Sequence, residues 1–265
     1  MTQAPLKLYW WKAVPNFGDA LSQLVVAHVS GRAVAHAGPK GAELWALGSL
    51  MHVVRQNREE FRRRPVIWGL GQLGHVPRDV VQHVDIALLR GPIGAALLGV
   101  SDVRFGDPGL LAPQALAPAP ARTDKIGIVP HYSQLDDPDL KALLAREPRL
   151  QLIDVGGDAQ DVCHAIASCA HVLASSLHGL IVADAYGVPN TWLKPGTQSH
   201  FKYYDDAASV GRVLAAPLGW QDVPDALRDL TDDTLPYSDG ILAAQEALYQ
   251  TFPAHMRAGS EPAVA

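Results

Sequence analysis

The sequence predicts an α/β protein with two Rossmann-like domains that face each other across a cleft. In both halves of the 265-residue chain, short apolar segments typical of strands alternate with helical segments, which favours parallel sheets with right-handed crossovers. The Ala- and Pro-rich segment 115–122 favours an extended linker and divides the chain into two similar lengths. We therefore expect an N-terminal domain over residues 1–116, a C-terminal domain over 123–257 and a loose tail over 258–265.

In the first half, apolar runs bounded by polar residues or glycine predict five strands, at residues 7–11, 43–48, 66–70, 85–89 and 103–106. Helices are expected over residues 19–29, 50–61 and 91–98. Asp19 is the expected N-cap of the first helix and Gly31 its stop.

The second half continues the alternation. Strands are expected at 125–131, 150–154 and 171–174, with helices over 138–146, 158–168, 180–186 and 239–248. Gly187 suits the left-handed position that ends a helix, and Pro189 precedes one more strand. No internal repeat is evident.

Composition excludes several classes of function. A net charge of −5 argues against nucleic acid as the main ligand, because phosphate backbones require a basic face. No apolar run reaches the length of a membrane span, and the N-terminus lacks the features of a signal peptide, so we expect a cytoplasmic protein. Cys163 and Cys169 are interpreted as buried apolar residues, unsuited to a mutual disulfide or a zinc site.

The segment 170–193 is the most informative for function. It predicts a polar elbow over residues 175–179, which places Ser175, Ser176 and His178 between the carboxyl end of a strand and the amino end of a helix. Ligands bind at that edge of parallel sheets, and free N–H groups there attract phosphate or carboxylate. His178 is therefore a candidate catalytic residue. Alternatively it caps the helix or bonds a buried carbonyl.

The segment Trp68-Gly-Leu-Gly-Gln-Leu-Gly74 fits the GxGxxG pattern of dinucleotide-binding loops, but its context does not. A helix should follow, yet the chain continues His75-Val-Pro-Arg, and no acidic residue follows at the required distance. These glycines are more consistent with close approach of another group or with a turn.

Other strand ends carry further candidates. Arg90 can grip a carboxylate or phosphate with its planar donors, or pair with Asp107. Asn16 and Gly18 could contact a sugar or phosphate, and His131 could face the cleft or lie in a surface loop. The segment 200–206 gathers groups that bind sugars, although such clusters are also common on solvated surfaces.

The ordered set of motifs resembles the polysaccharide pyruvyl transferase family, most closely the short exopolysaccharide ketal pyruvate transferases of the xanthan type. The motifs are Asn16-Phe-Gly-Asp19, Trp68-Gly-Leu-Gly71, Leu89-Arg-Gly-Pro92, Gly106-Asp-Pro-Gly-Leu-Leu111, Val129-Pro-His131 and Ser175-Ser-Leu-His-Gly-Leu-Ile181. The resemblance covers roughly residues 7–206. One departure is Ser176, where many family members have Arg.

The resemblance implies a GT-B-like fold and transfer of pyruvate from phosphoenolpyruvate to a terminal hexose as a ketal, without redox cofactor or obligatory metal. It implies His178 and Arg90 as the catalytic residues at the donor site. We expect substrate contacts from Asn16, Gly18, Asp19, His131, Ser175, Ser176, Leu177 and Gly179, and acceptor contacts from Lys202, Tyr203, Tyr204 and Asp205. The implied acceptor is a lipid-linked oligosaccharide at the inner face of the cytoplasmic membrane, which adds an expectation of peripheral membrane contact.

Two other functions compete with this reading. One is a GT-B glycosyltransferase that uses a nucleotide sugar. The other is a non-catalytic subunit of an exopolysaccharide assembly complex. Phosphoenolpyruvate binding and the effect of His178→Ala discriminate among the three.

Overall fold

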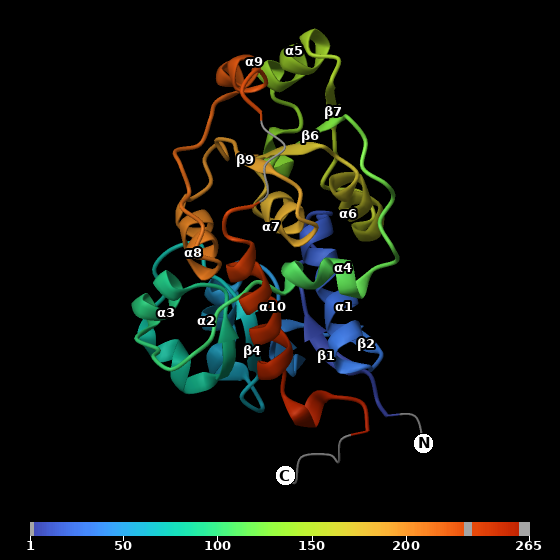
Figure 1. Cartoon of the computed structure of the whole chain (residues 1–265). Coiled ribbons are helices and arrows are strands. Elements are labelled where there is room, and N and C mark those ends of the chain that lie inside the picture. Colours follow the sequence, from blue (N-terminus) through green and yellow to red (C-terminus); the bar gives the residue numbers. More distant parts are fainter. Residues whose placement is uncertain (1–2, 231–234, 260–265) are drawn as a thin grey trace.

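The computed structural model describes residues 3–230 and 235–259, and it confirms the predicted α/β class with two parallel sheets (Figure 1). The first sheet has the order β2-β1-β3-β4-β5, with bounds Val34–His36, Leu6–Tyr9, Leu44–Trp45, Val66–Leu70 and Asp85–Leu89. The second has the order β7-β6-β8-β9, with bounds Leu150–Leu152, Ile126–Val129, His171–Ala174 and Asn190–Trp192. All pairings between these strands are parallel.

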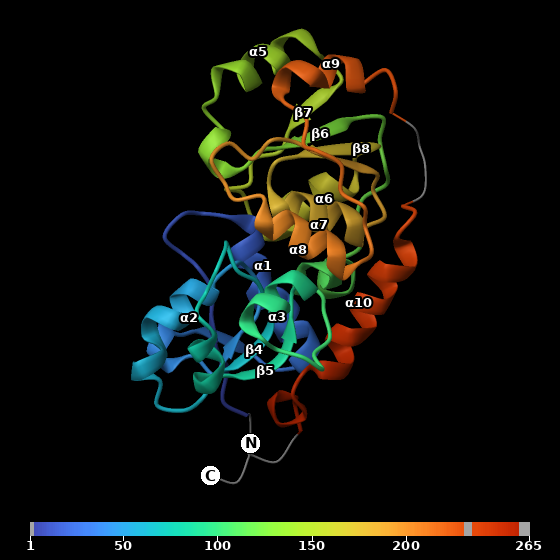
Figure 2. The same cartoon turned by 90° about the vertical axis from the view of Figure 1, so that its left-hand side faces the viewer.

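Helices cover both sheets (Figures 1 and 2). In the first half they are α1 (Phe17–Ser30), α2 (Met51–Asn57), α3 (Pro92–Leu98) and α4 (Ala112–Ala115), with 3-10 turns at Pro39–Gly41, Arg58–Glu60, Arg78–His83 and Pro108–Leu111. In the second half they are α5 (Pro138–Arg146), α6 (Ala159–Ala167), α7 (Leu177–Ala185), α8 (Phe201–Ser209) and α9 (Val223–Ala226), with 3-10 turns at Tyr132–Gln134 and Trp220–Asp222. Helix α10 (Ser238–Thr251) and a turn at Ala254–Met256 complete the described chain.

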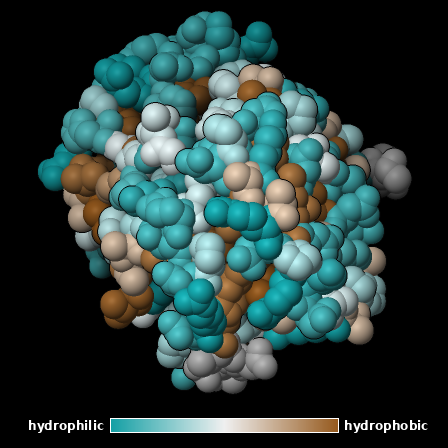
Figure 3. Space-filling model, turned by 90° about the horizontal axis from the view of Figure 1, so that it is seen from above, coloured by the Kyte–Doolittle hydropathy of each residue, from teal (hydrophilic) through white to brown (hydrophobic). Residues whose placement is uncertain are grey.

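The outer helices have one apolar side, whereas α7 is apolar all round. Helix α5 buries Leu140 and Leu143 and exposes most of its other residues. Figure 3 looks down on this end of the molecule and shows a mostly hydrophilic surface with separate hydrophobic patches. Nearly every residue of α7 is buried, as expected for a helix without a polar face.

Helix α7 joins the two halves. It packs on the 3-10 turn at Pro108–Leu111 from the first half and on α6 from the second, while α1 packs on α6. One apolar cluster therefore runs through both halves, from Leu8 and Phe17 to Val129 and Leu180. Burial of a shared core fixes how the two sheets meet.

Helix α10 returns from the second half to the first sheet, along which it runs in Figures 1 and 2. Trp68 Nε1 donates to the Leu248 carbonyl at 3.1 Å, and the ring of Trp68 meets Phe252 edge to face. Gln245 Nε2 also donates to the Leu110 carbonyl at 2.8 Å. The boundaries of two domains stay a prediction, but residues 238–251 pack on the first sheet.

The structure corrects the expected start of α1. The helix begins at Phe17, and Asn16 is its N-cap, since Asn16 Oδ1 accepts from Gly18 N at 2.9 Å. Asp19 therefore lies inside the first turn. A tertiary bond fixes this register, because Phe17 N donates to the Val155 carbonyl at 2.7 Å. Gly31 ends the helix as expected, with φ of +67°.

Other differences concern elements whose sequence signal was weak. The strand expected at 103–106 is a single bridge between Phe105 and Leu89, whereas the edge strand β2 was not expected. Helix α7 begins three residues earlier than expected, so the elbow is only Ser175 and Ser176. Helix α8 was expected only as a polar cluster. The tail expected at 258–265 falls mostly outside the described residues.

Within the described residues, no helix is both long and apolar enough to cross a bilayer. Both cysteines are buried and free, in agreement with the interpretation from sequence.

Candidate active site

The carboxyl ends of the strands of both sheets bring a cluster of charged side chains together between the two halves. Arg90 follows β5, and Asp107 precedes the turn at Pro108–Leu111. Asp19 and His178 come from the first turns of α1 and α7, and Lys202 from the first turn of α8. Parallel α/β sheets bind ligands at such edges, so this charged cluster is the candidate site.

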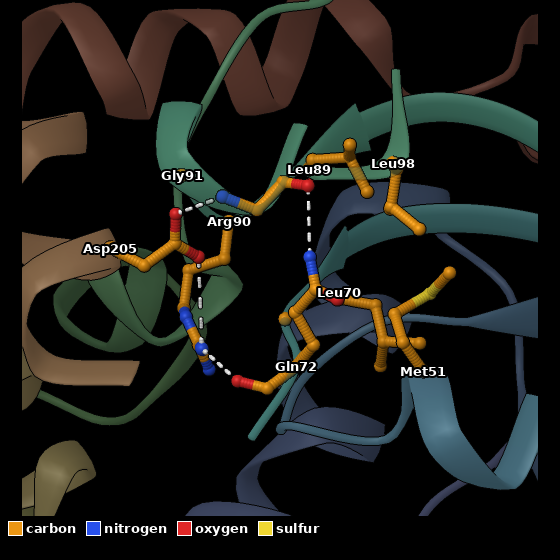
Figure 4. Close-up of a pocket in the computed structure, with 10 residues that line it drawn as sticks. Met51, Leu70, Gln72, Leu89, Arg90, Gly91, Leu98 and Asp205 are labelled. Atoms are coloured by element: carbon orange, nitrogen blue, oxygen red, sulfur yellow. Dashed lines mark hydrogen bonds and ion pairs between the residues drawn. The ribbon is translucent and has the colours of Figure 1, made fainter. Parts of the chain in front are cut away.

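Arg90 is fully buried and held from the first half by two hydrogen bonds, of which Figure 4 shows the one to Gln72. Its Nη1 donates to Ser49 Oγ at 2.8 Å and its Nη2 to the Gln72 carbonyl at 3.3 Å. Nη2 lies 3.9 Å from Asp205 Oδ2 on α8. The ion partner of Arg90 is thus Asp205 rather than Asp107, the partner considered from sequence.

Gly71 explains the glycine-rich segment after β4. A β-carbon at this position would lie 2.1 Å from Arg90 Cζ, so only glycine lets the guanidinium lie against the backbone. Gly69 has φ of +81° at an irregularity in the β4–β5 register, and Pro108 packs against it. No atom lies within 4 Å of a β-carbon built at Gly74. These glycines accommodate an arginine and a proline, not a dinucleotide.

Asp205 closes the same pocket from the second half. Its Oδ1 accepts from Gly94 N at 2.7 Å, and a β-carbon at Gly91 would clash with its carboxylate and carbonyl. Asp205 thus docks α8 onto the start of α3 and lies beside Arg90 (Figure 4). The pocket is lined by Met51, Leu70, Gly71, Gln72, Leu89, Arg90, Gly91, Gly94, Leu98 and Asp205.

His178 lies against the first turn of α1. A β-carbon at Gly18 would lie 2.0 Å from His178 Nδ1, so the backbone of α1 touches the imidazole. The Nε2 atom is buried and has no hydrogen-bond partner among the described residues. Burial, reinforced by the positive charges of Arg90 and Lys202, lowers the pKa of His178 to about 3. The imidazole is therefore neutral at pH 7 and able to accept a proton or hydrogen bond.

Lys202 supplies a second buried cation. Burial and the nearby charge of Arg90 lower its pKa to about 8, against the opposing effect of Asp19. Among the described residues, Arg90 has one carboxylate partner, Asp205 at 3.9 Å, and Lys202 has none within 4 Å, so the pair retains positive charge for an anionic ligand.

The carboxyls of Asp19 and Asp107 are weakly acidic. Burial raises the pKa of Asp19 to about 7, which Lys202 opposes and Asp107 reinforces. Burial also raises the pKa of Asp107 to about 6, and Arg90 opposes the rise. Asp107 Oδ1 accepts from Gly109 N at 2.9 Å, whereas its Oδ2 has no partner among the described residues.

Several unpartnered polar atoms mark the same region. Besides those of His178 and Asp107, Arg90 Nε and Gln72 Oε1 are buried without a partner in the part of the chain that the structure describes. Buried polar groups are nearly always hydrogen-bonded, so their concentration here indicates a place where a ligand completes the bonding.

Some predicted contact residues have structural roles instead. Ser175 Oγ donates to Gln134 Oε1 and accepts from His131 N, so it ties β8 to the end of β6. Ser176 caps α7 through Gly179 N at 3.3 Å. Gly179 packs against Val129, where a β-carbon would be too close.

The remaining predicted residues divide between core and surface. Leu177 is buried, and Tyr203 is buried with its hydroxyl donating to the Ser175 carbonyl at 2.5 Å. Tyr204 is 41% exposed and packs edge to face on Trp192. His131 is buried. Burial and the charge of Lys202 lower the pKa of His131 to about 4. The surface reading of His131 was therefore wrong.

Sequence reasoning missed Ser49, Gln72 and Asp206. Asp206 is buried on α8, and burial together with three neighbouring carboxylates raises its pKa well above the usual range. Ser49 and Gln72 follow β3 and β4, so the rule that pointed to Arg90 could have found both. Within residues 3–230 and 235–259, no group of three or more histidine, cysteine or acidic side chains is arranged to hold a metal ion.

Comparison with known proteins yields a family and several relatives. Residues 56–196 match the family model described as polysaccharide pyruvyl transferase. The uncharacterized protein L143 of Acanthamoeba polyphaga mimivirus is 33% identical over 158 residues, which cover 54% of each chain. The succinoglycan biosynthesis protein ExoV of Rhizobium meliloti is 32% identical over 136 residues, covering 48% of this chain and 41% of that protein. The chain spans about half the length of these curated relatives.

Two solved structures are similar at low identity. An uncharacterized Klebsiella pneumoniae protein, KP1_0663, aligns with a TM-score of 0.49 at 14% identity, covering 77% of this chain and 87% of that one. The spinosyn rhamnosyltransferase SpnG aligns with a TM-score of 0.44 at 11% identity, covering 93% and 96%. Neither likeness bears on the chemistry of the site.

Proposed function

Because the chain belongs to the polysaccharide pyruvyl transferase family, we propose that it transfers pyruvate from phosphoenolpyruvate to a terminal hexose of an exopolysaccharide repeat unit, as a ketal. The observation that carries the proposal is the pairing of two buried cations, Arg90 and Lys202, with the neutral imidazole of His178, whose Nε2 atom is buried and has no hydrogen-bond partner among the described residues. The printed role of ExoV in succinoglycan biosynthesis supports an exopolysaccharide acceptor.

The charges of the site suit this donor. Phosphoenolpyruvate carries a carboxylate and a phosphate, and Arg90 and Lys202 supply one cation for each. The guanidinium has an unpartnered Nε, and its planar donors match a carboxylate or a phosphate edge. Such preorganised positive charge stabilises the negative charge on the leaving phosphate.

The chemistry also needs a proton acceptor. The sugar hydroxyl that attacks C2 of the donor must lose its proton, and a neutral imidazole with an unpartnered buried Nε2 can take it. Burial, with the charges of Arg90 and Lys202, keeps His178 neutral in the free protein, and a bound anion would raise its pKa toward the working range. His178 is therefore proposed as the general base.

The acceptor and location follow from the same proposal. We propose a lipid-linked oligosaccharide as acceptor, with the enzyme in the cytoplasm and in peripheral contact with the inner face of the membrane. Tyr204 is the exposed aromatic residue next to the site from which an acceptor sugar would gain a stacking surface.

The test is release of phosphate from phosphoenolpyruvate by the purified chain, with and without a lipid-linked oligosaccharide extract from an exopolysaccharide producer. We expect acceptor-dependent release that His178→Ala lowers at least about 100-fold, the usual scale for loss of a general base. Arg90→Lys should raise KM for phosphoenolpyruvate, because lysine lacks the planar fork.

Matched controls are His28→Ala, which removes an exposed histidine in the last turn of α1, and Arg146→Ala, which removes an exposed arginine in the last turn of α5. Both should keep normal turnover. Absence of phosphate release, together with no shift of the melting temperature by phosphoenolpyruvate, would refute the proposed donor.

A further inference from the structure

The proposed reaction leaves one proton without a source. C3 of phosphoenolpyruvate must gain a proton before C2 becomes electrophilic, and a neutral His178 cannot supply it. The donor of that proton must carry it near neutral pH and face the same cleft.

Asp19 lies on the first turn of α1, directly after Gly18, whose backbone contacts the imidazole of His178 on α7. Asp19 therefore follows the residue at which α1 and α7 meet between the two halves. Asp19 Oδ1 also lies against the backbone of Gly48, 3.4 Å from where a β-carbon would be. Gly48 has φ of +105°, a conformation that favours glycine and keeps this position open.

The carboxyl of Asp19 has no structural task. Asn16 caps the helix, and Asp19 makes no hydrogen bond or ion pair within 4 Å among the described residues. Asp19 is only half-buried, so part of the residue is accessible from outside the protein. A first-turn carboxyl that neither caps nor pairs is free to act on a ligand.

The charged groups around Asp19 come from three directions. Lys202 on α8 favours its ionised form, while Asp107 favours its protonated form. Tyr9 on β1 feels the charge of Asp19 as well, which contributes to a raised pKa of that phenol. Burial exceeds the effect of Lys202, so the carboxyl holds its proton up to about pH 7 while His178 stays neutral down to about pH 3. Neighbours with pKa values pushed apart in this way divide the roles of acid and base.

We propose that Asp19 donates the proton that C3 of phosphoenolpyruvate gains, while His178 accepts the proton of the attacking hydroxyl. This inference rests on the proposed function. In the first step a C3–H bond forms at the expense of the Asp19 O–H bond, the hydroxyl oxygen bonds to C2, and its proton passes to His178 Nε2. In the second step the bond from C2 to the phosphate oxygen breaks, and phosphate leaves with the proton from His178. A second hydroxyl then bonds to C2 and returns its proton to Asp19, so both residues end as they began.

The experiment compares Asp19→Asn with Asp161→Asn in the phosphate-release assay, from pH 5.5 to 9. Asp161 is a matched control because it is also an acidic first-turn residue, on α6, but it is exposed. We expect Asp19→Asn to lower kcat about 100-fold or more and to abolish the fall of kcat at alkaline pH, while it melts at or above the temperature at which Asp161→Asn melts.

Each outcome decides the matter. If the wild type turns over and the kcat of Asp19→Asn still falls at alkaline pH as the wild-type kcat does, the role of Asp19 is overturned, whatever the size of the variant's kcat. The proposed function then still stands. Failure of the wild type to release phosphate overturns the proposed function and, with it, this role. If Asp19→Asn does not fold, Asp19→Glu serves instead and is expected to turn over with a kcat that falls at alkaline pH. A folded Asp19→Glu whose kcat does not fall at alkaline pH overturns the inference.

Discussion

Asp205→Ala should cost more stability than its long ion-pair distance suggests. The side chain of Asp205 is 1% exposed, that of Arg90 is fully buried, and the two lie 3.9 Å apart. Removal leaves a buried guanidinium without its nearest carboxylate and a buried Gly94 N–H without an acceptor. Both losses fall at the contact between α8 and α3.

The magnitude follows from these two losses. Breaking a buried ion pair by removing one partner costs about 3–5 kcal/mol, and a hydrogen bond to a charged group contributes about 1.5–3 kcal/mol. Ser49 and Gln72 still hold Arg90, and burial opposes ionisation of Asp205 by raising its pKa, so the lower end applies. We expect a loss of about 3 kcal/mol in the free energy of unfolding, or roughly 6–12 °C in the melting temperature.

The assay is equilibrium unfolding in urea at pH 7, with two comparison variants. Asp205→Asn keeps an acceptor for Gly94 N and removes a carboxyl whose pKa burial raises, so it should lose less stability than Asp205→Ala, at most about 1 kcal/mol. Asp136→Ala removes a shorter ion pair, with Asp136 Oδ1 2.8 Å from Lys141 Nζ. The side chain of Asp136 is 99% exposed, so its removal should not measurably change the free energy of unfolding. If Asp205→Ala lowers the free energy of unfolding no more than Asp136→Ala does, burial does not determine how much the Arg90–Asp205 contact stabilises the protein, and the reasoning fails.

Three further predictions concern the site. Gly71→Ala should displace Arg90 and raise KM for phosphoenolpyruvate at least about 10-fold, whereas Gly74→Ala, with open space around it, should match the wild type in the same kinetic assay. Asp107→Asn should stabilise the protein at pH 7 by up to about 3 kcal/mol in urea unfolding. Because the pKa of Asp107 is raised to about 6, the native state binds more protons than the unfolded state, and wild-type stability falls as pH rises from about 4 to 6. Equal stability of the wild type and Asp107→Asn at pH 7 would contradict this. In the wild type, donor binding should weaken as pH rises through about 8, the lowered pKa of the Lys202 ammonium, because the cation loses its charge. Lys202→Gln should remove this pH dependence. Calorimetric titration of phosphoenolpyruvate at pH 7 and 9 measures the difference.

Elements with strong local signals were predictable from sequence. The bounds of α5 and β8 agree with the structure, because proline and an acidic cap start the first and an unbroken apolar run makes the second. Arg90 and His178 were predicted as site residues by one rule, that side chains following the carboxyl ends of parallel strands face the ligand side of a sheet, and here the ends of the two sheets bring them together. The rule needs no knowledge of packing.

Helix α8 shows where that reasoning stops. Its buried positions include Lys202, Asp205 and Asp206, so the polar side that seemed to face solvent faces the charged cluster instead. Hydrophobic periodicity assumes an apolar interior, and an active site violates that assumption. Asp19 was misassigned for a related reason. Asn16 and Asp19 are equally good caps, and a bond from Phe17 to Val155, distant in sequence, chose between them.

The return of α10 to the first sheet means that the chain crosses between the halves twice, between α4 and β6 and again between α9 and α10. The apolar cluster shared by the halves fixes the angle between them, and His178 crosses that junction to contact Gly18 of α1. Arg90 follows β5 in the first half, so the distance between this cation and the imidazole is set by how the two halves pack. A variant that alters that packing far from any reacting atom, such as one at Trp68 where α10 returns to the first sheet, should therefore change the rate.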